Sequence, residues 1–193
     1  IRKIHSEYGN DFLLFSSDFG SNSQRLLKER ALRFELVGAK KTQYELDFIR
    51  KQQEGNFQSF HQFVDLLQKM DSDIRIPKII VRPHPAEDHK EWFEATSNLK
   101  KTKVVYQGDI SPWLLASKGL LHRGCTTAIQ AAISGVKTGF LTNYSVEDSN
   151  SIVPQISPSL RSIEDIANWA NNNSFDLSNT KNKEVLNAHI TFP

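Results

Sequence analysis

The sequence predicts an α/β fold in which a Rossmann-like, mostly parallel sheet carries helices on both faces. The first observation is a set of short apolar runs, each closed by polar residues, glycine or proline, at 12–15, 79–81, 104–106, 119–121 and 138–141. Such runs are apolar on both faces, which is typical of strands buried on both sides of a parallel sheet. The second observation is that segments with helical spacing lie between these runs.

One apolar stripe runs along each of the helical segments. It includes Phe60, Val64 and Leu67 before the second run, and Ile129, Ala132 and Ile133 after the fourth. In a fold of alternating strands and helices, ligands bind beyond the carboxyl ends of the strands. We therefore expect site residues directly after the apolar runs.

The polar stretch 24–70 is helix-prone and unusually long. Gly55 and Asn56 form a helix-breaking pair within it, so we expect two helices that meet at this pair. One further helix is predicted at 162–171. The tail 172–193 is rich in Asn and Ser, and we expect it to be weakly ordered or to dock on another lobe.

The composition bounds the size and the partners of the protein. At 193 residues the chain is long enough for one domain, with an ordered core at about 12–171. Lys and Arg number 24 against 22 Asp and Glu, so nonspecific binding of nucleic acid is not expected. The apolar runs fall far short of the roughly 20 residues that cross a bilayer, and we expect no signal peptide. We expect a cytoplasmic protein that can still associate with the inner face of the cytoplasmic membrane.

Cys125 is the only cysteine of the sequence. An intrachain disulfide framework and a cysteine metal cluster are therefore excluded, and a reducing cytosol fits. His5, His61, His89 and His189 show no metal-ligand spacing, so we expect no metal ion. No GxGxxG or Walker-type loop is present, so a nucleotide would be held without that phosphate cradle.

The first motif, Arg82-Pro83-His84-Pro85, directly follows an apolar run. Its two prolines restrict the backbone on either side of one imidazole. A rigidly held His84 can donate to a phosphate or ribose oxygen, and Arg82 can pair with a phosphate. The alternative is that the prolines only end a strand and that His84 caps a neighbouring carbonyl. The motif alone does not decide between the two.

The second motif runs from His122 to Thr127, between an apolar run and a helical segment. A glycine turn at Gly124 and a helix start offer free backbone N–H groups, and two threonine hydroxyls add donors, so a phosphate would be held well. The alternative is an ordinary turn followed by an ordinary N-cap at Thr126 or Thr127. Cys125 could be a nucleophile at a helix start, but no His and Asp arrangement supports this, and a small buried residue is the better interpretation.

Two further loops follow predicted strands. In the loop 108–111, Ser111 could cap a helix, and the loop could pack on a nucleobase or serve as a plain connector. We expect Trp113, which follows it, to be a core residue. The loop 15–22 is rich in Ser, Asp and Gly and would face the same edge of the sheet. Asp18 could bind an acceptor hydroxyl or act as a base, although these residue types also favour turns.

The order of these motifs resembles the donor lobe of GT-B glycosyltransferases. Within that fold the chain is most similar to bacterial surface-carbohydrate biosynthesis proteins, which are related to capsular Kdo transferases and to bacterial sialyltransferases with a His-Pro motif and a Ser/Thr pair. The resemblance spans about 12–141. It implies an enzyme of capsule or lipopolysaccharide O-antigen polysaccharide biosynthesis, which takes a CMP-activated sugar such as CMP-Kdo and a glycan or lipid-linked acceptor and needs no cofactor.

The resemblance also implies roles for particular residues. His84 and the threonine pair would contact the CMP phosphate and ribose, and the loop 108–111 would face the cytosine. The expected nucleotide-binding residues are Arg82, His84, Pro85, Gly108, Asp109, Ile110, Ser111, His122, Gly124, Cys125, Thr126 and Thr127. Gln130 stands where many GT-B enzymes place a ribose-binding Glu, which departs from the family pattern.

The chain begins with Ile1 rather than Met, and we expect a fragment of a longer protein that lacks the N-terminal acceptor lobe. In the resembling families that lobe usually supplies the catalytic carboxylate, so Asp18 is only a minor candidate for it. The alternatives are a glycerophosphotransferase or a UDP-sugar epimerase-like enzyme with the same elements, or a nucleotide-binding lobe without catalysis.

Overall fold

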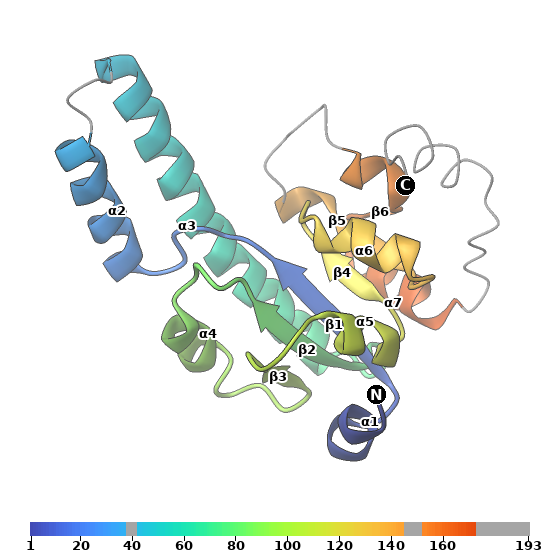
Figure 1. Cartoon of the computed structure of the whole chain (residues 1–193). Coiled ribbons are helices and arrows are strands. Elements are labelled where there is room, and N and C mark those ends of the chain that lie inside the picture. The colour runs from blue at the N-terminus through green and yellow to red at the C-terminus, as the bar shows by residue number, and fades with distance from the viewer. Residues whose placement is uncertain (38–41, 145–151, 173–193) are drawn as a thin grey trace.

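Six parallel strands form one sheet at the centre of the molecule (Figure 1). The computed structural model describes residues 1–37, 42–144 and 152–172. Within these residues the strand order is β3-β2-β1-β4-β5-β6, and every pairing is parallel. The strands are β1 (Phe12–Ser17), β2 (Lys78–Pro83), β3 (Thr102–Val104), β4 (Leu120–His122), β5 (Thr138–Leu141) and β6 (Ser159–Leu160). The predicted α/β, Rossmann-like fold is thereby confirmed.

Each of the five predicted apolar runs overlaps a strand, and the run 138–141 coincides with β5. The sequence predicts the third strand at 104–106, but β3 begins two residues earlier and ends at Val104, and Tyr106 is exposed. The two-residue strand β6 escapes prediction because it contains no apolar run. The helix before β1 is also missed, because it is short and none of its residues is fully buried, although Ile4 and Tyr8 pack on the core from one face.

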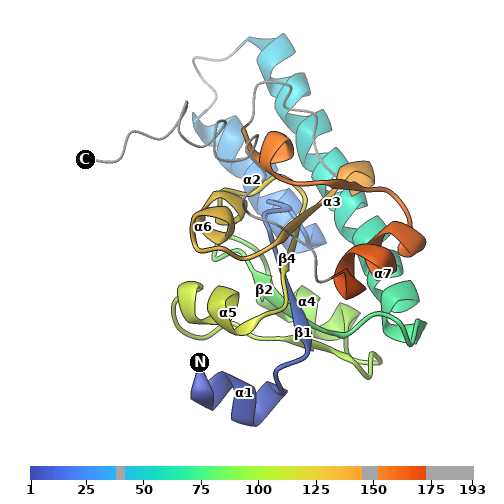
Figure 2. The same ribbon diagram turned by 90° about the vertical axis from the view of Figure 1, so that its right-hand side faces the viewer.

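Helices cover both faces of the sheet (Figures 1 and 2). They are α1 (Arg2–Tyr8), α2 (Gln24–Val37), α3 (Gln43–Ser72), α4 (His89–Ala95), α5 (Ser111–Ala116), α6 (Thr127–Ile133) and α7 (Ile163–Asn171), with short 3₁₀ turns at Thr142–Tyr144 and Val153–Ile156. Leu13 and Phe15 of β1 join a core cluster with α3, α4 and α7, whereas Phe12 and Leu14 join a second cluster with α1, α5 and α6. Alternate side chains of one strand therefore enter two separate cores, as expected for a parallel sheet buried on both faces.

An aromatic cluster fixes the loop that follows β1. The rings of Phe15 and Phe63 stack with their centroids 4.0 Å apart. Phe19, which comes just after the strand, lies 5.5 Å from the Phe63 centroid and 5.8 Å from that of Trp92. Buried aromatic pairs contribute roughly 0.5–1.5 kcal/mol beyond the burial of their surface. The anchored Phe19 leaves its neighbour Asp18 exposed at the carboxyl edge of the sheet.

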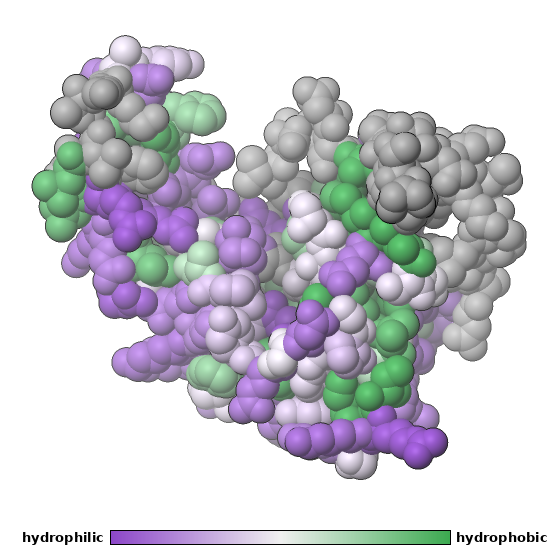
Figure 3. Space-filling model, in the orientation of Figure 1, coloured by the Kyte–Doolittle hydropathy of each residue, from purple (hydrophilic) through white to green (hydrophobic). Residues whose placement is uncertain are grey.

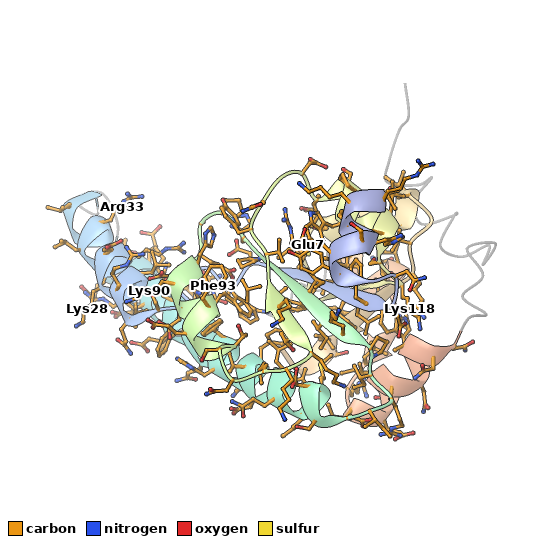
Figure 4. The ribbon with its side chains drawn as sticks, turned by 90° about the horizontal axis from the view of Figure 1, so that it is seen from below. Glu7, Lys28, Arg33, Lys90, Phe93 and Lys118 are labelled. Atoms are coloured by element: carbon orange, nitrogen blue, oxygen red, sulfur yellow. The ribbon has the colours of Figure 1, made fainter. Side chains whose placement is uncertain are left out.

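The helices α2 and α3 form an arm that extends beyond the sheet (Figure 1). Figure 4 shows Lys28 and Arg33 of α2 at one end of the molecule, with Lys118 near the other. The exposed apolar side chains on this arm are Leu32, Leu36, Tyr44 and Phe48. Figure 3 shows apolar surface there beside strongly polar surface.

The predicted break at Gly55 is wrong, because α3 runs through this residue without interruption. The helix begins instead at a capping box in which the Thr42 side chain accepts the Glu45 N–H and the Glu45 carboxylate accepts the Thr42 N–H. Glycine inside a helix costs about 1 kcal/mol relative to alanine. Burial of Phe60 and Leu67 further along the same helix stabilises it by more than this.

The last helix agrees with its prediction to within one residue. Ser162 caps α7, since its hydroxyl accepts the Asp165 N–H at 3.0 Å and the Asp165 carboxylate accepts the Ser162 N–H. Of the predicted tail, residues 173–193 lie outside the described part of the chain. In the part that is described, no helix has the length and apolar character needed to cross a membrane.

Candidate functional site

Three polar loops meet at the carboxyl edge of the sheet because β1 lies between β2 and β4. Residue Ser17, the last of β1, pairs with Pro83, the last of β2, so the loops that follow begin at the same level. The loop after β4 starts beside them, because β4 is the other neighbour of β1. The sheet order therefore brings the loops that carry Asp18, His84 and Thr126 to one edge.

His84 and Asp18 face each other across two of these loops. The imidazole Nδ1 lies 3.9 Å from the Asp18 Oδ2, and the two side chains are 46% and 50% exposed. Each is oriented by a backbone N–H: Ala86 donates to His84 Nδ1 at 3.2 Å, and Gly20 donates to Asp18 Oδ1 at 2.6 Å. The pair is held in place and open to solvent, with Pro85 exposed beside it.

The threonine pair lies at the start of α6. Thr126 is the N-cap residue, its side chain is exposed, and within the described chain its hydroxyl makes no capping hydrogen bond. Thr127 Oγ1 lies 3.4 Å from the Ser16 Oγ of β1. The preceding turn needs a glycine, because Gly124 has a φ of 118°, which side chains strongly disfavour. The arrangement leaves one hydroxyl to solvent and ties the other to the central strand.

Arg82 is hydrogen-bonded to the loop that follows β3. Its two terminal nitrogens donate to the carbonyls of Gln107 and Gly108 at 2.6 and 2.7 Å, and its guanidinium carbon lies 5.3 Å from the centroid of the buried Trp113 ring. The side chain is buried, and burial lowers its pKa. Arg82 is thus engaged in shaping the loop, and a direct pairing with phosphate would compete with these contacts. The prediction of Trp113 as a core residue is confirmed.

The loop 108–111 is also joined to α6. The Asp109 carboxylate accepts the Ser111 N–H at 2.7 Å, and the Ser111 hydroxyl accepts from the Gln130 side chain at 3.0 Å. Ile110, not Ser111, is the N-cap residue of α5, so the predicted cap is displaced by one position. The reason is that the Ile110 carbonyl accepts the first helical hydrogen bond, from the Leu114 N–H at 3.0 Å. Gln130 therefore ties this loop to the one that carries the threonines.

His122 and Cys125 lie beneath the edge. The His122 imidazole is fully buried, Nε2 is 2.8 Å from the Ser157 Oγ, and Nδ1 accepts the Gly124 N–H at 3.2 Å. Burial lowers the pKa of His122 to about 3, so the ring is neutral at physiological pH. The Cys125 thiol donates to the Ser16 carbonyl at 3.1 Å, and burial raises its pKa. These contacts give both residues a part in supporting the loop from below.

Two residues outside the predicted set hold the site together. Glu87 is buried after β2, and its carboxylate accepts the N–H groups of Phe19 and His84. Arg123 is buried after β4 and donates to the Asp18 carbonyl at 3.2 Å. Charged side chains are rarely buried. The sequence around Glu87 therefore does not indicate that it is a buried acceptor of backbone N–H groups. Its role is recognised only from its contacts in the fold, with Phe19 and with Trp92 of α4.

The fold and this edge define a class: a Rossmann-like α/β protein with a cluster of polar loops beyond the carboxyl ends of its central strands. Comparison with protein-family models, with curated proteins and with solved structures gives no match to this chain. The resemblance to GT-B glycosyltransferases therefore depends on the motifs themselves. Among the described residues, no three His, Cys, Asp or Glu side chains are grouped so that they could hold a metal ion.

Proposed function

We propose that this chain is the nucleotide-sugar-binding lobe of a GT-B-type glycosyltransferase of bacterial surface polysaccharide biosynthesis, and that its donor is a CMP-activated sugar such as CMP-Kdo. The observation that supports this most is the open, oriented pair of His84 and Asp18 at the carboxyl edge. The exposed hydroxyl of Thr126 lies on another loop of the same edge. This is where α/β folds of this kind bind their ligands.

The arrangement suits a phosphate that gains charge as a sugar leaves it. Nδ1 of His84 accepts the Ala86 N–H, so the neutral imidazole carries its proton on Nε2 and can donate it to a phosphate oxygen. The Thr126 hydroxyl is a second donor. Donors that are held in place before the reaction stabilise developing negative charge without reorganisation. The chemical role proposed for this lobe is therefore to bind the donor and stabilise its leaving nucleotide.

The loop 108–111 is proposed to contact the base. Gly108 has a φ of 72°, and its neighbour Asp109 is exposed, so backbone groups of the turn can approach a flat ligand closely. Hydrogen bonds of Arg82 and Gln130 fix the loop on both sides. The acceptor, a glycan or a lipid-linked glycan, and the catalytic carboxylate are proposed to belong to an N-terminal lobe of the whole enzyme.

Replacement of His84 tests the proposal. We expect His84→Ala to weaken CMP binding by roughly tenfold, the value of one hydrogen bond to a charged group, as measured by isothermal titration calorimetry. His5→Gln is the matched control, because His5 contacts the Ala116 carbonyl, which precedes the start of β4, at the opposite edge. Tight binding of UDP or CDP-glycerol with no binding of CMP would replace the proposed donor by those of the epimerase or glycerophosphotransferase alternatives.

A further inference from the structure

Glu87 and Arg123 are oppositely charged and buried, and they lie on either side of the loop that follows β1. Each is 6% exposed. Glu87 follows β2 and Arg123 follows β4, and these strands flank β1 in the sheet. The two side chains therefore reach the segment Asp18-Phe19 from opposite sides.

The contacts of Glu87 are all with donors. Its Oε1 accepts the Phe19 N–H at 2.6 Å, and its Oε2 accepts the His84 N–H at 2.9 Å and the Trp92 indole N–H at 2.8 Å. An ionised carboxylate only accepts hydrogen bonds, whereas a protonated one must donate at one of its oxygens. The ionised form therefore satisfies all three donors. On protonation one oxygen carries a hydrogen, which faces one of the three N–H groups and displaces that hydrogen bond.

Arg123 complements this acceptor from the other side. Its Nη1 donates to the Asp18 carbonyl, and its guanidinium carbon lies 4.3 Å from the centroid of the Phe19 ring, in cation–π contact. Burial lowers the pKa of Arg123 to about 10, and the negative charges of Glu87 and Asp18 act against this. The guanidinium is therefore positively charged at neutral pH and attracts the Glu87 carboxylate.

We propose that Glu87 is a positioning residue of the proposed nucleotide site, which holds His84 and Asp18 beside each other while its carboxylate is ionised. The inference rests on the proposed function for its ligand, but the contacts of Glu87 are independent of it. Glu87 binds the backbone of His84 directly, and it binds the backbone of Phe19, the residue after Asp18. Both members of the exposed pair thus depend on one buried carboxylate.

The protonation of Glu87 changes within the physiological range. Burial raises its pKa from 4.5 to about 7, although its three donors act in the opposite direction. The titratable and charged groups around it are Asp18 after β1, whose charge raises this pKa further, Arg123 after β4, and His84 on its own segment. We therefore expect the hydrogen bonds of Glu87 to rearrange as the pH falls through about 7 and the carboxyl group gains a proton. The raised pKa means that the folded chain as a whole is stabilised by this protonation, at the cost of one of the three bonds.

A pH titration by ¹H–¹⁵N NMR on the full chain tests this directly. We expect the amides of Phe19 and His84 and the indole of Trp92 to titrate together with a midpoint near pH 7, and to lose this transition in Glu87→Gln. Glu94→Gln is the matched control, because Glu94 is an exposed acid on α4 that pairs with Lys90. Independent midpoints for the three donors in the wild type, or an unchanged transition in Glu87→Gln, would overturn the proposal.

The second measurement is the ratio of the CMP dissociation constants of Glu87→Gln and wild type as a function of pH. We expect a ratio near one below pH 6, where both side chains are neutral, and about tenfold above pH 8, where only the carboxylate accepts all three bonds. Glu87→Asp, which keeps the charge, should bind more tightly than Glu87→Gln at the higher pH. A ratio that stays constant with pH would contradict a positioning role of the Glu87 carboxylate and would show that Glu87 is only structural. Failure of wild type to bind CMP would refute the proposed function, while the amide titration would still decide the role of Glu87.

Discussion

Two buried titratable residues, His122 and Glu87, act in opposite directions on folding stability. Burial lowers the pKa of His122 from 6.5 to about 3, so its contribution is present above pH 6.5 and is lost as the pH falls below that value. Burial raises the pKa of Glu87 from 4.5 to about 7, so its contribution is present below pH 4.5 and is lost as the pH rises to 7. Between pH 4.5 and 6.5 the two slopes oppose each other.

Glu87→Gln should separate these contributions, because it removes one titration and leaves the other. In the wild type, Glu87 alone accounts for a loss of roughly 3 kcal/mol between pH 4.5 and 7. We expect the free energy of unfolding of the variant to rise with pH up to about 6.5, where the wild type stays nearly level. Urea unfolding at half-unit pH steps measures both curves, and parallel curves would contradict the assignment.

Some residues of the candidate site could be predicted from the sequence, and others could not. Asp18, His84 and Thr126 could be proposed from sequence because polar residues directly after apolar runs face the ligand edge of a parallel sheet. The sequence does not reveal that His122 is buried against Ser157 or that Arg82 holds a neighbouring loop. Those roles depend on partners that are distant along the chain, and no local pattern encodes them.

At the scale of secondary-structure elements, packing overrides local propensity in α3. Gly55 favours a break, yet the helix continues because the buried side chains beyond it keep the helical period. Strand β5 could be predicted to the residue because it is apolar and fully buried, whereas β6 is too short to show any pattern. Elements that are defined by their own sequence are predicted well, and those defined by their neighbours are not.

Gly55→Ala should stabilise the protein, because the glycine lies inside α3 with open space around it. Alanine is better than glycine in a helix by about 1 kcal/mol, and the gain is measured as a higher urea midpoint. Gly139→Ala is the contrasting substitution, since its new Cβ would lie 2.6 Å from the Leu160 Cδ1 and 3.1 Å from the Trp169 ring. It should destabilise by roughly 1–3 kcal/mol, the usual cost of overpacking. Equal effects of the two substitutions would count against this description of the helix and the sheet.

At the scale of the whole molecule, the order of the strands creates the site. The alternation of apolar runs and helical segments predicts a parallel sheet, but not that β1 lies between β2 and β4. This order makes the loops after these three strands neighbours, with Asp18 in contact with both His84 and Arg123. The loop after β3 is joined to the same edge through Gln130. Segments more than 100 residues apart along the chain thus form one polar rim.

The central claim is that this rim binds the phosphate of a nucleotide, and the most direct test is NMR mapping of CMP binding to the ¹⁵N-labelled chain. We predict that the amide signals of His84, Gly108 and Gly124 to Thr126 shift with one common dissociation constant, while those of Lys118 and Lys137 at the opposite edge stay unchanged. An absence of shifts at saturating CMP, or shifts confined to the edge that carries Lys118 and Lys137, would contradict the claim.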